Sequence, residues 1–286
     1  MPMTARLDPA WLDAQYNSGA RITDHADIFE RWAEASALSR RNSVCMPDVR
    51  YGDAPEVTPG VFHTNAPHAP VLVFIHGGWW RALDKADHAF VAPSFSADGA
   101  LMVMPNYSLC AAVTVEQITL QTVRALTWVW HNAVALDGDP RCIVVAGHSA
   151  GAHLAAMLPS CRWKEVQAGL PAQLLSGALA ISGVFDLEPI RQTRFLQADL
   201  NLTPAAVRRL GPAFFPRQRG RLYAVAGADE SAEFLRQNEL IRDVRGPISV
   251  PVCERLAGHH HLSILNSLAD PAGRLHELAL RLLGLR

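Results

Sequence analysis

The chain has 286 residues, of which 49% are hydrophobic and 19% are charged, and its formal net charge at pH 7 is −1. This length allows a large buried core, and the small net charge argues against electrostatic binding of nucleic acid or of an anionic membrane. No apolar run approaches the roughly 20 residues of a transmembrane helix, and the N-terminus lacks the basic and apolar regions of a signal peptide. The five cysteines include no Cys-x-x-Cys pair, which predicts reduced thiols and, with the other features, a cytoplasmic protein.

Residues 1 to about 40 are predicted to be helical. Asp8, which is followed by a proline, is suited to cap a first helix. Ile28, Trp32 and Ala35 lie four and three residues apart, so they form one apolar stripe on a second helix. Because these helices precede the first strand, we expect them to pack outside the sheet. Two roles stay open, a lid over an active site and a plain cover for a sheet edge.

Strands and helices alternate along the rest of the chain. Weak strand signals between residues 44 and 61 are broken by prolines and a glycine, which predicts an edge hairpin. Further strands are predicted at 71–75, 101–104, 142–146, 178–182, 222–226 and 250–256, and helices at 87–97, 115–130, 231–244 and from 272 onward. We therefore expect an α/β fold with a mostly parallel central sheet, helices on both faces and a single domain over residues 1–286.

The sequence Gly-His-Ser-Ala-Gly at residues 147–151 matches a nucleophile elbow, the sharp turn from a strand into a helix that carries a reactive serine. Gly147 and Gly151 remove the crowding that side chains would cause in this turn. Ser149 would then stand at the carboxyl end of the sheet, with the N–H groups of the following helix close to it. We therefore predict that Ser149 is the nucleophile.

The buried strand 71–75 ends directly in His-Gly-Gly-Trp-Trp. Two glycines after such a strand allow the backbone to approach a ligand closely and to point its N–H groups at one position. In hydrolases with this kind of loop, one oxyanion donor lies on the loop and the other on the residue after the nucleophile. The predicted donors are the N–H groups of Gly77, Gly78 or Trp79, together with that of Ala150. A plain exit from the strand is the alternative.

A nucleophilic serine needs a histidine to accept its proton and an acid to orient that histidine. In hydrolases whose serine lies on such an elbow, the acid follows the serine along the chain and the histidine follows the acid. Asp229 and Glu230 follow the penultimate strand, and three consecutive histidines follow the final one. The usual position of the acid, three residues after the glycine that ends the strand, favours Glu230. The start of the next helical turn favours His261. Asp229 and His260 stay open as alternatives.

Three adjacent histidines, 259–261, also raise the question of a metal site. Consecutive side chains point in different directions, and no His-Glu-x-x-His motif or dispersed set of cysteines and histidines accompanies them. The triad is therefore the favoured interpretation, and we expect no metal and no cofactor. His148 and His153 flank the serine, and their positions at the elbow and one helical turn later favour structural roles.

Taken together, these motifs make the chain resemble the kynurenine formamidase (arylformamidase) branch of the α/β-hydrolase fold, and in particular its bacterial members. The His-Gly-Gly-Trp-Trp loop combined with the later segment Glu-Phe-x-Arg-Gln is fairly specific to this branch, whereas the elbow alone is not. The likeness extends over nearly the whole chain and includes residues 7–17, 76–85, 105–107, 147–151, 182–189, 230–237 and 261–265.

The resemblance implies an α/β-hydrolase fold in which Ser149 is the nucleophile, Glu230 the acid and His261 the base. The same matching puts the oxyanion donors at Gly78 and Trp79, together with the residue after the serine. The implied activity is hydrolysis of an aryl formamide, with N-formyl-L-kynurenine yielding L-kynurenine and formate through a formyl-enzyme intermediate.

Trp79, Trp80 and Phe185 are candidates for aromatic walls around the aryl group of such a substrate. Core packing is the alternative role for each of them, and for Trp80 in particular. The chain also departs from the family next to the expected base, because it has His-His-Leu at 260–262 where relatives have Asn-His-Phe. This departure places Leu262 beside the base and bears on the choice of substrate.

Two rival functions stay open. The same triad could serve a carboxylesterase or a different amidase that acts on another acyl group. A hydrolase-like binding protein that has lost catalysis is a rival from a different class, although such loss usually removes the serine or the histidine, and both are present here. The expected partner is a small-molecule substrate, with no nucleic acid and no membrane, and a homodimer is an open alternative to a monomer.

Overall fold

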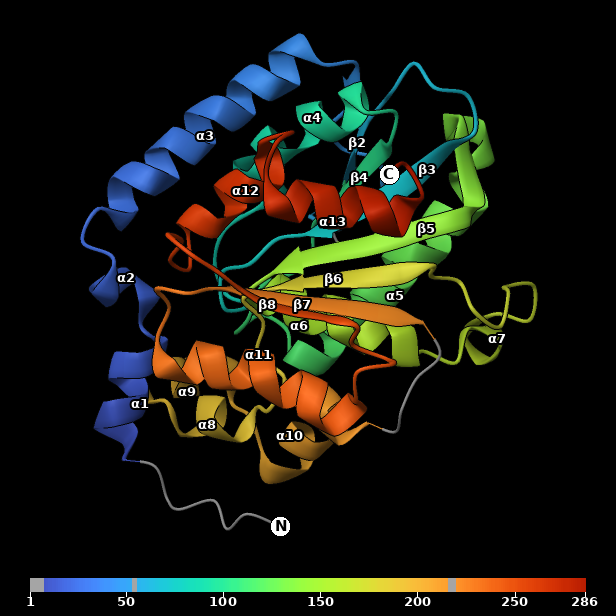
Figure 1. Cartoon of the computed structure of the whole chain (residues 1–286). Coiled ribbons are helices and arrows are strands. Elements are labelled where there is room, and N and C mark those ends of the chain that lie inside the picture. Colours follow the sequence, from blue (N-terminus) through green and yellow to red (C-terminus); the bar gives the residue numbers. More distant parts are fainter. Residues whose placement is uncertain (1–7, 53–55, 216–219) are drawn as a thin grey trace.

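The computed structural model describes residues 8–52, 56–215 and 220–286. Within these ranges, a central sheet has eight strands in the order β1-β2-β4-β3-β5-β6-β7-β8 (Figure 1). The strands are β1 (Cys45–Met46), β2 (Pro59–Phe62), β3 (Ala69–Ile75), β4 (Leu101–Pro105), β5 (Gly138–His148), β6 (Gly177–Ile181), β7 (Arg221–Gly227) and β8 (Val252–Leu256). β1 and β2 form the predicted antiparallel edge hairpin, and β2 also pairs antiparallel with β4. All pairs from β4 to β8 are parallel, which confirms the predicted mostly parallel sheet.

Helices connect these strands. The α-helices are α1 (Pro9–Tyr16), α2 (Ser18–Arg21), α3 (His25–Asn42), α4 (Ala92–Ala97), α5 (Val115–Asn132), α6 (Ala150–Met157), α7 (Trp163–Val166), α8 (Glu188–Gln192), α9 (Arg194–Leu200), α10 (Pro204–Leu210), α11 (Ala232–Arg245), α12 (Asn266–Ala269) and α13 (Arg274–Leu283). The 3₁₀ helices are η1 (Lys85–Val91), η2 (Val134–Leu136), η3 (Leu158–Ser160), η4 (Pro212–Phe214) and η5 (Ser263–Leu265). Within the described ranges, none of the helices has both the length and the apolarity needed to cross a membrane.

Helices α8, α9 and α10, between β6 and β7, were not predicted. They have only five to seven residues each, and so short a helix contains too few turns for an apolar repeat to be recognised. The predicted helix 87–97 is in fact two segments, the 3₁₀ helix η1 followed by α4.

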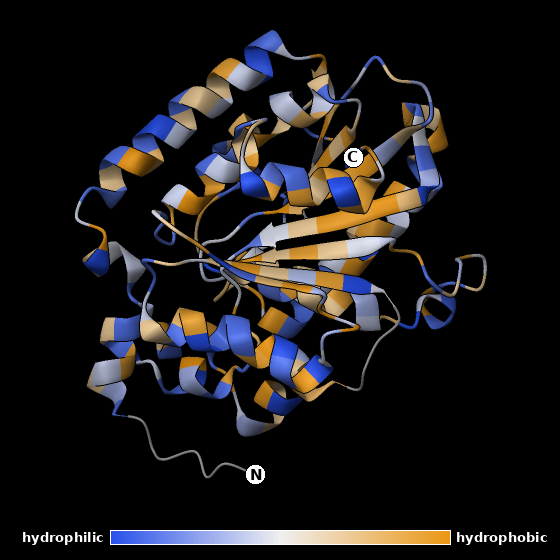
Figure 2. Ribbon diagram, in the orientation of Figure 1, coloured by the Kyte–Doolittle hydropathy of each residue, from blue (hydrophilic) through white to orange (hydrophobic). Residues whose placement is uncertain are grey.

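The sheet is covered on both faces, as the sequence predicts. Alternate residues of β3 face opposite sides, so that Val71, Val73 and Ile75 belong to one core cluster, while Leu72 and Phe74 belong to the other. Helices α3, α4, α12 and α13 lie over one face, and α6, α8, α10 and α11 lie over the other (Figure 1). Figure 2 shows that apolar residues concentrate in the strands, whereas the helices carry polar residues on their outer sides.

The N-terminal segment passes from one face of the sheet to the other. α1 contributes Leu12 and Tyr16 to one core cluster, and α3 contributes Ile28 and Trp32 to the second. α2 lies between them, on the side of the molecule toward which the arrowheads of β5 and β6 point (Figure 1). The segment therefore crosses the carboxyl ends of the parallel strands, where ligands bind in open α/β sheets.

The buried face of α3 differs in one position from the predicted stripe. Ala35 is exposed, whereas Ser36 is buried together with Ile28 and Trp32. Ser36 continues their four-residue spacing, and its Oγ accepts a hydrogen bond from the N–H of Phe90 at 3.1 Å. A search for apolar residues overlooks this position because the side chain is polar.

Candidate active site

Ser149 occupies the turn between β5 and α6, with backbone angles of φ +56° and ψ −116°. Residues other than glycine rarely adopt such angles, and strain of this kind is common at functional sites. The turn requires glycine on both sides. A Cβ atom at Gly147 would lie 2.2 Å from the carbonyl oxygen of Gly151, and a Cβ atom at Gly151 would lie 2.0 Å from that of Ile75. The two glycines therefore allow the close backbone packing that holds Ser149 at the carboxyl end of β5.

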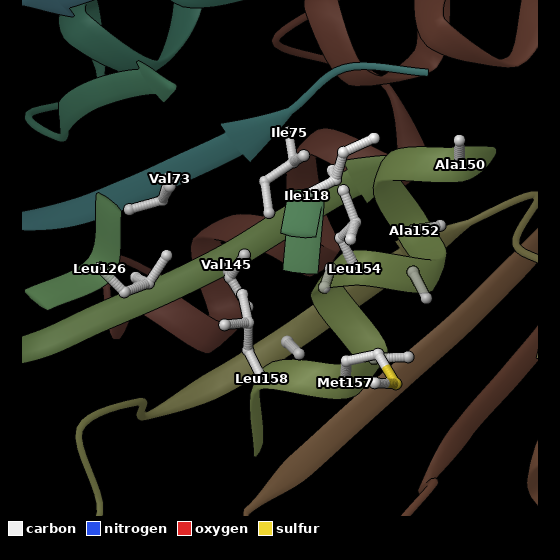
Figure 3. Close-up of a cluster of buried hydrophobic side chains, with 14 of the residues drawn as sticks. Val73, Ile75, Ile118, Leu126, Val145, Ala150, Ala152, Leu154, Met157 and Leu158 are labelled. Atoms are coloured by element: carbon white, nitrogen blue, oxygen red, sulfur yellow. The ribbon is translucent and has the colours of Figure 1, made fainter. Parts of the chain in front are cut away.

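Helix α6 anchors this turn, because all of its residues are buried. Figure 3 shows Leu154 and Met157 of α6 in the same cluster as Val73 of β3, Ile118 of α5 and Val145 of β5. The N–H of Ser149 also donates to the carbonyl oxygen of Ile181 at 2.9 Å. The serine is therefore attached to the rigid core rather than to a surface loop.

A chain of hydrogen bonds joins three side chains that lie far apart in the sequence. His261 Nε2 lies 3.0 Å from Ser149 Oγ, and His261 Nδ1 lies 2.7 Å from Glu230 Oε2. Because a carboxylate only accepts hydrogen bonds, Nδ1 carries the ring proton and Nε2 presents its lone pair to the hydroxyl. In this arrangement His261 can accept the proton of Ser149 when the oxygen attacks a carbonyl carbon.

The second oxygen of Glu230 is held as firmly as the first. Glu230 Oε1 accepts hydrogen bonds from the N–H of Gly227 at 2.7 Å and from Ser182 Oγ at 2.5 Å. Three donors, those two and His261 Nδ1, therefore converge on one buried carboxylate. This leaves the Glu230 side chain in a single orientation, which in turn orients the imidazole.

The structure brings Glu230 and His261 to Ser149, and it does not bring their sequence neighbours there. Asp229 is exposed. His260 Nδ1 accepts hydrogen bonds from the N–H groups of Leu262 and Ser263, both at 3.2 Å, which turns this ring away from the serine. The sequence left two acids and two histidines open. In the structure, His261 contacts the nucleophile and Glu230 contacts His261.

The two histidines that flank the serine have structural partners. His148 Nε2 donates to the carbonyl oxygen of His261 at 2.7 Å, and burial lowers the pKa of His148 well below its ordinary value. His153 Nε2 donates to the carbonyl oxygen of Leu210 at 2.7 Å, and burial lowers the pKa of His153 to about 4. Both rings are therefore neutral at pH 7, and His148 supports the backbone of His261.

The loop after β3 provides backbone N–H groups next to the elbow. A Cβ atom at Gly77 would lie 3.2 Å from the Cβ of Ser149, and the loop turns sharply after it, with φ of +103° at Gly78 and +51° at Trp79. Within the described residues, the N–H groups of Gly77, Gly78, Trp79 and Ala150 have no protein acceptor. They are therefore available to stabilise an oxyanion on a bound substrate.

A pocket of about 340 Å³ opens onto Ser149 and His261. Four aromatic side chains contribute to its wall: Phe29 and Trp32 of α3, Trp79 of the loop after β3, and Phe195 of α9. Leu262 also lines it, beside His261, as expected from its place in the sequence. Trp79 contacts Phe195 edge to face, with 6.4 Å between ring centroids. The pocket is therefore an aromatic chamber next to the nucleophile, suited to a flat ring.

Two residues predicted to contact substrate pack the core instead. Trp80 and Phe185 are completely buried, and neither lines the pocket beside Ser149. Trp80 packs edge to face against His153 at 5.0 Å, and the N–H of Phe185 donates to Gln237 Oε1 at 2.8 Å. Core packing thus replaces the substrate-binding role predicted for these two residues, and Trp79 alone of the three reaches the pocket.

Sequence reasoning did not identify Phe29 or Phe195 as candidate wall residues. Phe29 lies beside the apolar stripe of α3, so its flanking position was the available signal. Phe195 belongs to one of the short helices that carry no recognisable pattern. The N-terminal segment nevertheless contributes directly to the site, because Asn17, Ser18 and Gly19 also line the pocket.

Comparison with known proteins indicates the fold of the chain and its broad class of activity. The kynurenine formamidase of Danio rerio is 28% identical to this chain over 260 residues, which cover 87% of this chain and 86% of that protein. The esterase LipQ of Mycobacterium tuberculosis is 31% identical over 163 residues, but these cover 52% of this chain and 37% of LipQ. The formamidase likeness is thus the more extensive of the two.

A solved structure from Silicibacter sp., provisionally assigned as a thioesterase, superposes with a TM-score of 0.81 at 28% identity, covering 92% of this chain and 97% of the other. The family model described as BD-FAE matches residues 62–189, which include the loop after β3 and the elbow. The sheet order, the nucleophile elbow and these relatives all indicate the same fold. The chain is a hydrolase with the α/β-hydrolase fold, and it is similar to kynurenine formamidases over most of its length.

Proposed function

We propose that this hydrolase cleaves an aryl formamide, that its substrate is N-formyl-L-kynurenine, and that its products are L-kynurenine and formate. The observation that carries this proposal is the aromatic pocket beside Ser149, which has four aromatic side chains in its wall. An aryl leaving group can stack or pack edge to face in such a chamber. The extent of the likeness to the Danio rerio kynurenine formamidase supports the same substrate class.

In the first half of the reaction, Ser149 Oγ attacks the formyl carbon while His261 Nε2 accepts the hydroxyl proton. The carbonyl oxygen becomes an oxyanion, and the N–H groups of Gly78, Trp79 and Ala150 donate to it. Each such donor contributes roughly 3 kcal/mol to transition-state stabilisation. Glu230 continues to accept the hydrogen bond from His261 Nδ1 and stabilises the imidazolium that forms.

In the second half, the carbon–nitrogen bond breaks and His261 donates its Nε2 proton to the departing aniline nitrogen. The formyl group then remains as an ester on Ser149. A water molecule attacks this ester while His261 again accepts a proton, and formate leaves as Ser149 regains its hydrogen. The acyl group needs almost no room, so most of the pocket is free for the leaving group.

The likeness to LipQ supports a second candidate, a carboxylesterase that uses the same three side chains on another acyl group. Rates of hydrolysis of N-formyl-L-kynurenine, formanilide and para-nitrophenyl acetate separate the two. The proposal predicts the highest kcat/KM for N-formyl-L-kynurenine, with measurable turnover of formanilide. Turnover of the acetate ester alone would replace the formamidase proposal with the esterase.

A further inference from the structure

A second pocket, of about 240 Å³, adjoins the aromatic pocket on the other side of His261. Ser18 and His261 line both pockets, so the two meet at the base. The second pocket differs in character, because its wall includes the charged side chains of Arg21, Asp24 and Asp229. A ligand whose reacting group lies at Ser149 can therefore extend past His261 into polar surroundings.

Apart from Glu230, whose carboxylate is held by three donors, the charged groups of this second pocket have few partners in the protein. Within the described residues, Arg21 makes no ion pair, and the Asp229 carboxylate accepts no hydrogen bond. Asp24 makes one long contact, with Arg31 at 3.8 Å, and both side chains of that pair are exposed. Exposed pairs of this kind contribute little. The pocket therefore presents one guanidinium and two carboxylates that are available to a ligand.

The carboxylates of Asp24 and Asp229 lie near the same imidazole ring, that of His260, although the two residues are about 200 positions apart in the sequence. Burial lowers the pKa of His260, and the carboxylates of Asp24 and Asp229 oppose that shift, which requires both to be near it. Arg21, in the last turn of α2, lies on the same wall. Positive and negative groups thus face one small space.

Arg81 also lies near the nucleophile, but its guanidinium is not available to bind an anionic group of a ligand. Arg81 lines the aromatic pocket, but its guanidinium is paired with the carboxylate of Asp199 and donates to the carbonyl oxygen of Phe195 at 3.0 Å. Among the described residues that line the two pockets, Arg21 is therefore the guanidinium able to receive an anionic group from a ligand at Ser149.

We propose that the second pocket binds a zwitterionic α-amino acid group on the leaving-group side of the substrate. Arg21 pairs with the α-carboxylate, and Asp24 and Asp229 accept hydrogen bonds from the α-ammonium. This inference rests on the proposed function, in which the scissile formamide lies at Ser149 and the aryl ring in the aromatic pocket. It assigns substrate selection to α2, to the turn between α2 and α3 and to the loop after β7, outside the groups that carry out bond cleavage.

The test compares two aryl formamides that differ in the amino acid group. N-formyl-L-kynurenine carries the zwitterion, whereas ortho-formamidoacetophenone retains the ring, the formamide and the ketone without it. The measured quantity is the ratio of their kcat/KM values in the wild-type protein and in Arg21→Gln and Asp229→Asn. We expect the ratio to fall about tenfold in each variant, mainly through a higher KM for N-formyl-L-kynurenine.

Arg162→Gln is the matched control, since it removes an exposed guanidinium beside α7, at the opposite end of the molecule from α2 (Figure 1). It should leave the ratio at the wild-type value. An unchanged ratio in both pocket variants would overturn the proposal, and turnover of the acetophenone shows that such a variant is folded. If the wild-type protein hydrolyses neither formamide, the proposed function fails and this inference fails with it.

Discussion

Ser182 donates a hydrogen bond to Glu230, with 2.5 Å between Ser182 Oγ and Glu230 Oε1. Ser182 follows β6 directly and has a positive φ of +53°, and its N–H donates to the carbonyl oxygen of Val225 on β7 at 2.7 Å. The neighbouring strand thus helps to fix the acid that orients His261. Ser182 does not contact the reacting atoms, so it is a positioning residue.

Replacing Ser182 by alanine removes one of three donors to the Glu230 carboxylate. We expect kcat for the formamide to fall about tenfold with little change in KM, because a buried hydrogen bond to a charged group is worth about 1.5–3 kcal/mol. Ser182→Gly is the informative companion, since glycine relieves the backbone strain of a positive φ but also lacks the hydroxyl. Wild-type kcat in the glycine variant would contradict a role for the hydroxyl.

The packing of the elbow predicts that its glycines tolerate no side chain. In Gly151→Ala, the new Cβ would lie 2.0 Å from the carbonyl oxygen of Ile75, and we expect a loss of about 3 kcal/mol or more of unfolding free energy. Gly169→Ala is the control, because nothing lies within 4 Å of a Cβ there. Urea unfolding of both variants measures the difference, and equal stabilities would show that the elbow is less tightly packed than described.

The aromatic wall predicts a binding effect for Phe29→Ala. Loss of a ring from the pocket should raise KM for an aryl formamide about fivefold at nearly constant kcat, since the ring contributes equally to ground-state and transition-state binding. Leu38→Ala changes an exposed position of the same helix α3 and serves as the control. Initial-rate kinetics with formanilide measure both. A fall in kcat without a change in KM would argue that Phe29 supports the catalytic groups instead.

Burial of His153 predicts a pH dependence of stability. Its pKa is about 4 in the folded protein against an ordinary value of 6.5, so the unfolded chain binds the proton more readily. Stability is therefore fully present above pH 6.5 and falls as the pH decreases toward 4, by up to about 1.4 kcal/mol per pH unit from this residue. His153→Gln should flatten the dependence of Tm on pH between 7 and 5 relative to wild type. The exposed His68→Gln should not, and an equal slope in all three proteins would contradict this account.

The parts of the site that local patterns specify were predictable from the sequence. Gly147 and Gly151 mark the elbow because only glycine fits there, and chain order restricts the acid and the histidine to the ends of two late strands. The choice of Glu230 over Asp229 depends on which side chain turns inward, and the structure shows this through three converging donors.

The pocket walls could not be predicted in the same way. Phe29 and Arg21 reach the site because the N-terminal segment crosses the carboxyl ends of the strands, a path that its helical periodicity does not specify. Phe195 depends on how the short helix α9 packs. Trp80 and Phe185 are candidates because their aromatic rings suit an aryl group, whereas tertiary packing places both in the core.

The central claim is that Ser149 attacks the formyl carbon, and rapid-quench mass spectrometry of the protein mixed with N-formyl-L-kynurenine tests it most directly. We predict a transient mass increase of one formyl group that maps to Ser149, together with release of formate, and a loss of turnover by roughly 10⁵-fold or more in Ser149→Ala with its fold intact. Full turnover in Ser149→Ala, or a formyl group attached to a different residue, would contradict the account.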